Sequence, residues 1–60
     1  MAPTAGELIR EARGRSGMSQ AELARSAGVS QPVISAYERG HREPGLDMLR
    51  KLVAASGDDI

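Results

Sequence analysis

Four glycines divide the 60-residue chain into segments of similar length. They stand at positions 17, 28, 40 and 57, and each follows a stretch with helix-like spacing of apolar residues. Glycine is favoured just past a helix end because it adopts the left-handed conformation without a Cβ penalty. No segment alternates polar and apolar residues as a half-buried strand does. We therefore predict an all-α domain built from short helices.

Helix start signals precede the same segments. Thr4 and Glu7 fit a capping box, in which each side chain satisfies a free amide of the other residue, and so do Ser19 and Glu22. Ser30 is the predicted N-cap of the next helix. With the glycines, these signals predict helices at about residues 5–16, 20–27, 31–39 and 46–56.

Apolar residues three or four positions apart predict the inward side of each helix. The predicted inward residues are Leu8, Ile9 and Ala12 in the first helix, Leu23, Ala24 and Ala27 in the second, Ile34 and Tyr37 in the third, and Leu46, Leu49, Leu52 and Val53 in the fourth. A single domain of this size, spanning residues 1–60, buries a small core. Its stability therefore depends on well-formed helices.

Composition removes several classes of function. The chain has no cysteine, and His41 is its single histidine, so we expect neither a disulfide nor a metal site. It contains no phosphate-binding loop and no pattern for a catalytic nucleophile, so we expect no enzyme and no cofactor. The longest apolar runs cover a few residues and cannot span a bilayer. The absence of cysteine fits a reducing cytoplasm, where we expect the protein to be located.

Charge is unevenly distributed although the formal net charge is zero. From Arg10 to Arg42 there are six arginines and three acidic residues, a local balance of +3. Asp58 and Asp59 help to cancel this excess from outside that stretch. The distribution, more than the sum, bears on a polyanionic partner. A single tyrosine argues against a binder that stacks bases of single strands.

Residues 20–39 satisfy the demands of a helix-turn-helix, in which two helices cross steeply at a tight turn. The close contact needs a small residue in the first helix, and Ala24 fits. The turn needs a residue that tolerates positive φ, followed by a buried one, and Gly28 and Val29 fit. The second helix must be held at two inner points one turn apart, and Ile34 and Tyr37 fit. Because these features agree over twenty residues, we predict a helix-turn-helix here.

The same region resembles the Xre/Cro-type helix-turn-helix family, which includes phage repressors, restriction controllers and many antitoxins. The resemblance rests on SQAELARSAGVSQ at residues 19–31, on Ile34-Ser35, on YERG at residues 37–40, on Pro44, and on the spacing of Leu46, Leu49 and Leu52. It covers roughly residues 5–57 and implies a compact lambda-repressor-like bundle of four or five helices. The usual fifth helix would follow residue 57, so we expect this chain to be part of a longer protein.

The resemblance also implies roles for individual residues, with the third helix entering the major groove of DNA. The expected base-reading residues are Gln31, Ser35, Pro32 and Ala36. Those expected at the DNA backbone are Gln20, Ser30, Arg39, His41 and Arg42. Arg13 and Glu38 occupy positions that form a structural ion pair between the first and third helices. Gln31 is the strongest candidate for base reading because a carboxamide can pair with adenine through two hydrogen bonds.

Three functions are compatible with these features. The first is sequence-specific binding of double-stranded DNA by a repressor or antitoxin-type autoregulator, acting as a homodimer on two half-sites. The second is a protein-interaction adaptor or a toxin-binding antitoxin module with the same fold. The third is a regulatory appendage of a larger enzyme. The excess of arginine and the polar side of the third helix favour the first.

Overall fold

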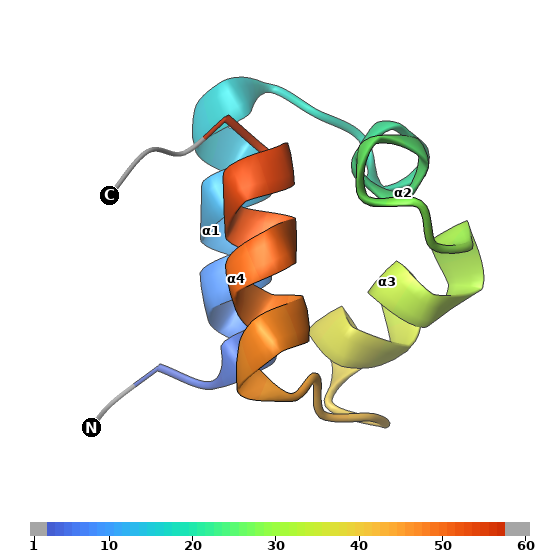
Figure 1. Ribbon diagram of the computed structural model, residues 1–60. Helices are drawn as coiled ribbons and strands as arrows, with labels where there is room; N and C mark the ends of the chain where they lie inside the picture. The colour runs from blue at the N-terminus through green and yellow to red at the C-terminus, as the bar shows by residue number, and fades with distance from the viewer. Residues whose placement is uncertain (1–2, 58–60) are drawn as a thin grey trace.

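The computed structural model describes residues 3–57, which form four helices and no strand (Figure 1). The helices are α1 (Ala5–Ser16), α2 (Gln20–Ala27), α3 (Gln31–Arg39) and α4 (Leu46–Ala55). The all-α prediction is confirmed. The helix bounds match those expected, except that α4 ends one residue earlier. Asp58 and Asp59 lie outside the described residues.

Side-chain caps hold the starts of α1 and α2. The Glu7 backbone N–H donates to Thr4 Oγ1 at 3.1 Å, and the Glu22 backbone N–H donates to Ser19 Oγ at 3.1 Å. Each glutamate accepts in return from the backbone of its cap residue. Ser30 occupies the cap position of α3, but its side chain makes no such bond. Pro32 supplies no N–H, and the Val33 N–H already donates to the Ser30 carbonyl oxygen, so both usual donors are missing.

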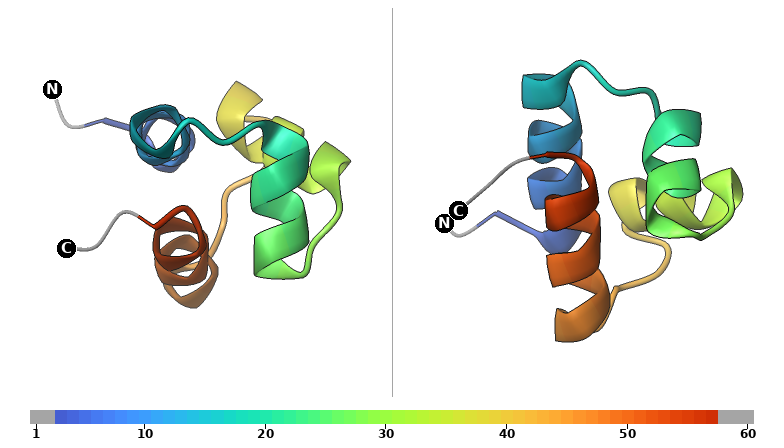
Figure 2. Two further views of the ribbon diagram at one scale, coloured as in Figure 1. Left: turned by 90° about the horizontal axis from the view of Figure 1, so that it is seen from above. Right: turned by 45° about the horizontal axis from the view of Figure 1, so that its top comes forward.

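α1 and α4 share one orientation, whereas α2 and α3 each take a different one (Figure 1). α1 and α4 lie side by side and run in the same direction, as Figures 1 and 2 both show. α2 crosses them steeply and is seen end-on in Figure 1. α3 packs against α1 and α2. This arrangement leaves one side of α3 facing outward.

Each helix contributes one large, fully buried side chain to the core. These residues are Ile9, Leu23, Ile34 and Leu52. Leu8 and Leu46 depart from the expected inward set, with 37% and 65% of their surface exposed. In α1 the buried positions are three residues apart and include Gly6 and Ile9, so Leu8 falls beside that line. Leu46 is the first residue of α4, and side chains tilt toward the helix N-terminus, away from the body of the helix.

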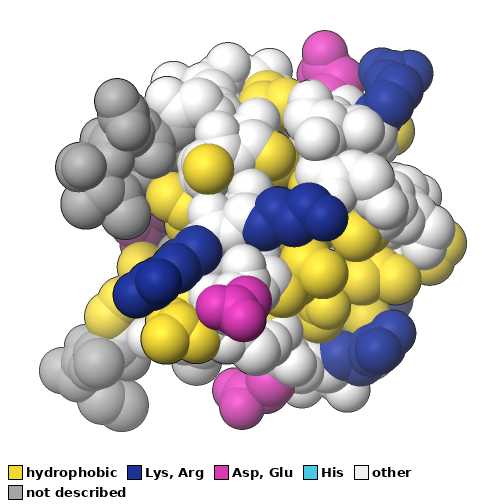
Figure 3. Space-filling model, in the orientation of Figure 1, with side chains coloured by type: hydrophobic (Ala, Val, Ile, Leu, Met, Phe, Trp, Pro, Cys, Tyr) yellow, Lys and Arg dark blue, Asp and Glu magenta, His cyan; other side chains and the backbone are white. Residues whose placement is uncertain are grey.

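The rim of the core reaches the surface between α4 and α3. Val29, Val33 and Met48 are partly buried and pack against the central cluster. Figure 3 shows hydrophobic side chains exposed on this face, beside lysine or arginine side chains. Within residues 3–57, no helix is both long enough and apolar enough to cross a membrane.

Gly6 sets how closely α1 approaches α3. It is buried, and a Cβ placed there would overlap the carbonyl oxygen of Tyr37 and lie 3.1 Å from the Glu38 Cα. Both are backbone atoms, so the contact cannot be relieved by rotating a side chain. Gly14, near the other end of α1, has nothing within 4 Å of its Cβ position. The two glycines of this helix therefore have opposite structural requirements.

We expect Gly6→Ala to lower the free energy of unfolding by about 1–3 kcal/mol, because the added methyl forces α1 away from α3. Gly14→Ala is the matched control and should raise it by up to about 1 kcal/mol through helix propensity alone. Urea unfolding followed by circular dichroism measures both. Equal effects of the two substitutions would contradict the close approach at Gly6.

Candidate nucleic-acid interface

The turn between α2 and α3 has the geometry that the sequence predicts. Gly28 ends α2 with a φ of 73°, a left-handed conformation that favours glycine. The Val29 backbone N–H then donates to the carbonyl oxygen of Ala24 at 2.9 Å, which closes the last turn of α2. Val29 is partly buried against the core, and α3 follows after Ser30. A steep crossing with this turn defines a helix-turn-helix.

The outward side of α3 carries the four predicted base-reading residues. Gln31 and Pro32 are exposed, and Ser35 and Ala36 are half-buried. They repeat with a spacing of four residues, which places them along one side of the helix. Ile34 and Tyr37 lie on the other side, in the core. The structure therefore brings all four residues together on the accessible side of α3.

Arg13 and Glu38 join α1 to α3 through two parallel hydrogen bonds. Arg13 Nε and Nη2 donate to the two carboxylate oxygens of Glu38, both at 2.9 Å. The side chain of Glu38 is 1% exposed and that of Arg13 is 22% exposed. Arg13 Nη1 also donates to the Met18 carbonyl oxygen at 3.1 Å. A second cationic side chain, that of Arg10, lies with its Nε 3.6 Å from Glu38 Oε1.

Glu38 is held as a carboxylate by its neighbours. Burial alone raises its pKa, but the hydrogen bonds from Arg13 and Gln20 and the charges of Arg13 and Arg10 outweigh that effect, so its net pKa is lowered. The hydrogen bond to Glu38 raises the pKa of Arg13 in turn. This almost fully buried acid is therefore ionised at neutral pH.

A line of hydrogen bonds connects this ion pair to the start of α3. Gln20 Nε2 donates to Glu38 Oε1 at 3.1 Å, and Gln31 Nε2 donates to Gln20 Oε1 at 2.8 Å. Sequence reasoning assigned Gln20 and Gln31 separate roles and gave no sign that they touch. It also left Arg10 unassigned, although the spacing of three from Arg13 places both on one side of α1.

The predicted backbone-contacting residues border α3 at both ends. Ser30 is exposed at its start, and Gln20 is half-buried at the start of α2. Arg39, His41 and Arg42 are exposed at its end. Two backbone bonds shape this second group, since the N–H groups of His41 and Arg42 both donate to the Ala36 carbonyl oxygen.

Metal-ligating side chains do not cluster near His41. In the described part of the chain, no three His, Cys, Asp or Glu residues are grouped as a metal site requires.

Comparison with known proteins agrees with this geometry. The helix-turn-helix family profile matches residues 9–56. The chain belongs to this family, and its resemblance to the Xre/Cro type is confirmed. No solved structure matches the chain.

Its relatives include several proteins named as HTH-type transcriptional regulators. An uncharacterised one from Archaeoglobus fulgidus is 44% identical over 55 residues, covering 92% of this chain and 24% of the relative. Another from Haemophilus influenzae is 42% identical over 56 residues, covering 88% and 57%. ImmR of Bacillus subtilis is 38% identical over 47 residues, covering 78% and 37%. The chain thus spans between about a quarter and somewhat over half of these three proteins.

We expect Arg13→Met to lower the free energy of unfolding by about 3 kcal/mol, because it leaves the buried Glu38 carboxylate without its main partner. The double variant Arg13→Met/Glu38→Met should recover most of this loss, since it removes both charges and keeps apolar volume. Urea unfolding compares the two. A double variant as unstable as the single one would show that stranding of the charge is not the cause.

Acid should destabilise the wild-type domain. A carboxyl whose pKa is lowered on folding contributes stability above its unfolded pKa, and this stability is lost as pH falls through the folded pKa. Glu38 is such a group, with an ordinary value of 4.5. The urea midpoint should therefore hold from neutral pH to about pH 5 and fall below it. In the Arg13→Met/Glu38→Met variant, the urea midpoint should fall less steeply with acid. The remaining fall would come from Glu7 and Glu22, whose pKa values are lowered by their cap hydrogen bonds.

Proposed function

We propose that this chain is the double-stranded DNA-binding part of a transcriptional regulator, with α3 lying in the major groove. The observation that carries the proposal is the outward side of α3, which is accessible, begins with Gln31 and lies directly beside the start of α2. In a helix-turn-helix, the second helix presents its N-terminal residues to base edges while the first crosses the backbone. The names of the relatives, all HTH-type transcriptional regulators, support the same function.

Base reading is assigned mainly to Gln31. Its bond to Gln20 uses one N–H of the amide. Its second N–H can donate to N7 of adenine, and its Oε1 can accept from the N6 amino group of the same base. Ser35 can bond to a base or a phosphate, and Pro32 and Ala36 offer only apolar contact, for instance to a thymine methyl group. Direct reading therefore involves few polar groups.

Backbone contacts are assigned to the residues around α3. Arg39, His41 and Arg42 follow its end and supply the cationic side. Ser30 and Gln20 stand at the starts of α3 and α2, where the positive end of each helix dipole favours phosphate. Because phosphate contacts carry most of the salt-dependent affinity, this group should provide much of the binding energy.

We further propose that two copies bind one operator. The domain measures 27 × 24 × 19 Å, whereas half-sites one helical turn apart are separated by about 34 Å. One domain therefore fits one half-site, and a palindromic site needs two. A toxin or other protein partner, the absence of catalysis and a cytoplasmic location stay predictions.

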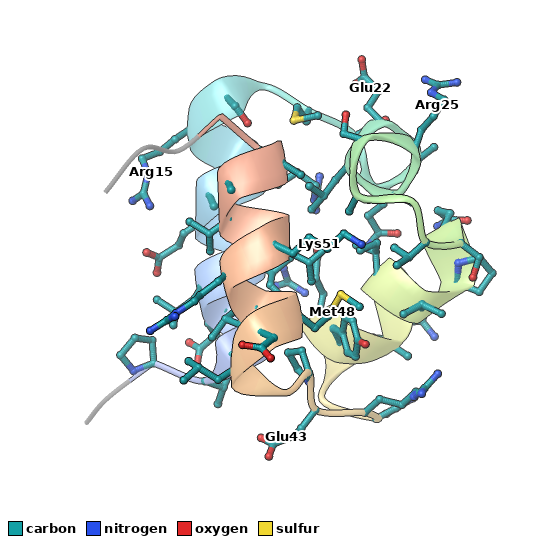
Figure 4. All side chains as sticks on the ribbon, viewed as in Figure 1. Arg15, Glu22, Arg25, Glu43, Met48 and Lys51 are labelled. Carbon is teal, nitrogen blue, oxygen red and sulfur yellow. The ribbon has the colours of Figure 1, made fainter. Side chains whose placement is uncertain are left out.

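Salt-dependent binding tests the backbone assignment. Arg42→Ala should make the slope of log K against log salt shallower by about 0.9, the value for one lost phosphate contact. Gln31→Ala should leave the slope unchanged. Arg15→Ala is the control, because Arg15 projects from α1 on the side away from α3 (Figure 4). Fluorescence anisotropy with labelled duplexes measures all three.

Selection of bound duplexes from a random pool tests the function as a whole. We expect a palindromic preference whose most strongly chosen position is lost with Gln31→Ala. No salt-sensitive binding at low ionic strength, even by an artificially dimerised protein, would refute the proposal. The protein-interaction role would then be the better account.

A further inference from the structure

We propose that Glu38 is a positioning residue for base recognition, whose carboxylate directs the amides of Gln20 and Gln31 so that Gln31 selects adenine over guanine. The inference rests on the proposed function, in which Gln31 reads a base. It gives a second role to a buried acid that the family resemblance assigns only to a structural ion pair with Arg13.

The direction of the hydrogen bonds follows from the chemistry of the first acceptor. A carboxylate can only accept, so Gln20 must turn its Nε2 toward Glu38, as it does at 3.1 Å. Its Oε1 then faces Gln31, which must present Nε2 to it, as it does at 2.8 Å. Each amide is therefore oriented by the group before it, and the order begins at Glu38.

Glu38 is well suited to fix this order. Two bonds from Arg13 hold its carboxylate, and almost none of its side chain meets water. A group held in this way cannot rotate to offer a different surface to Gln20. The low pKa of Glu38, caused by these same neighbours, keeps a proton off the oxygen that Gln20 contacts.

The order of the amides decides which purine edge fits. With Gln31 Nε2 bound to Gln20, the side chain presents one N–H and its Oε1 outward, and within residues 3–57 no group donates to that Oε1. This donor and acceptor match N7 and the N6 amino group of adenine. If both amides were reversed, Gln31 Oε1 would be engaged by Gln20 and its two N–H groups would point outward. Two donors match N7 and O6 of guanine.

The test compares the affinities of duplexes that differ only in having adenine or guanine at the position read by Gln31. That position is the one whose preference disappears in Gln31→Ala. A single side chain bonded to a base through two contacts discriminates by at least about fivefold, and the wild type should favour adenine by such a ratio. Arg13→Met/Glu38→Met lacks the directing carboxylate, so its ratio should fall toward one while preferences at other positions persist.

Two further variants separate positioning from general structural support. Arg13→Lys disturbs the same ion pair but keeps both a positive charge and the Glu38 carboxylate, so it should lower stability and retain the adenine preference. In Gln20→Lys, the ammonium group that replaces the amide has only donors. It should still donate to Glu38, and Gln31 should then turn its Oε1 toward it. The N–H groups of Gln31 would point outward, so the preference should shift toward guanine. Gln20 is only half-buried, and its replacement leaves both Arg13 and Glu38 in place. Gln20→Lys therefore tests the proposal even if the double variant fails to fold.

The outcomes are distinct. Loss of the adenine preference in the double variant, its reversal in Gln20→Lys and its retention in Arg13→Lys would support the role of Glu38. An unchanged ratio in the double variant or in Gln20→Lys would overturn it while leaving the proposed function intact, as would a loss spread evenly over all positions. Failure of the wild type to bind duplex DNA would overturn both. An unaltered preference in Gln31→Ala would overturn the role of Glu38 together with the assignment of base reading to Gln31, while DNA binding by the domain would stand.

Discussion

The contact between Arg13 and Glu38 is the interaction on which the arrangement of this small domain most depends. It joins α1 to α3 across 25 residues of sequence, with two hydrogen bonds of 2.9 Å. A buried ion pair gains little over a well-packed apolar contact, but separating its partners leaves an uncompensated buried charge. We infer that it serves to hold α3 at one angle and register against α1. The close backbone contact at Gly6 acts at the same boundary.

The polar network and the apolar core have different tasks. Four large side chains, one from each helix, close the core and hold the helices together. The network around Glu38 runs along the edge of that core and ends at Gln31, on the outward side of α3. A single set of contacts thus links the rigid interior to the surface assigned to DNA. This coupling is why a residue with almost no exposed surface can bear on which base is chosen.

Sequence reasoning succeeded where the signal is local. Capping boxes at Thr4 and Ser19 and the left-handed glycines depend on residues within one turn, and the helix bounds followed from them. It erred where a side chain's surroundings come from elsewhere in the fold, since Leu8 has helical spacing but lies beside the buried line of α1. Ser30 is the N-cap of α3 as predicted, and its missing side-chain bond has a local cause in Pro32 and Val33.

The sequence by itself determined the class of fold, the helix-turn-helix and the residues along the outward side of α3, because caps, turns and apolar spacing are encoded within a few positions. Only the tertiary structure decided that Gly6 must lack a side chain, that Arg10 lies beside Glu38, and that Gln20 connects Glu38 to Gln31. These contacts join residues 10 or more positions apart. Their distances and donor directions depend on how the helices pack, and no short-range pattern in the chain specifies that packing.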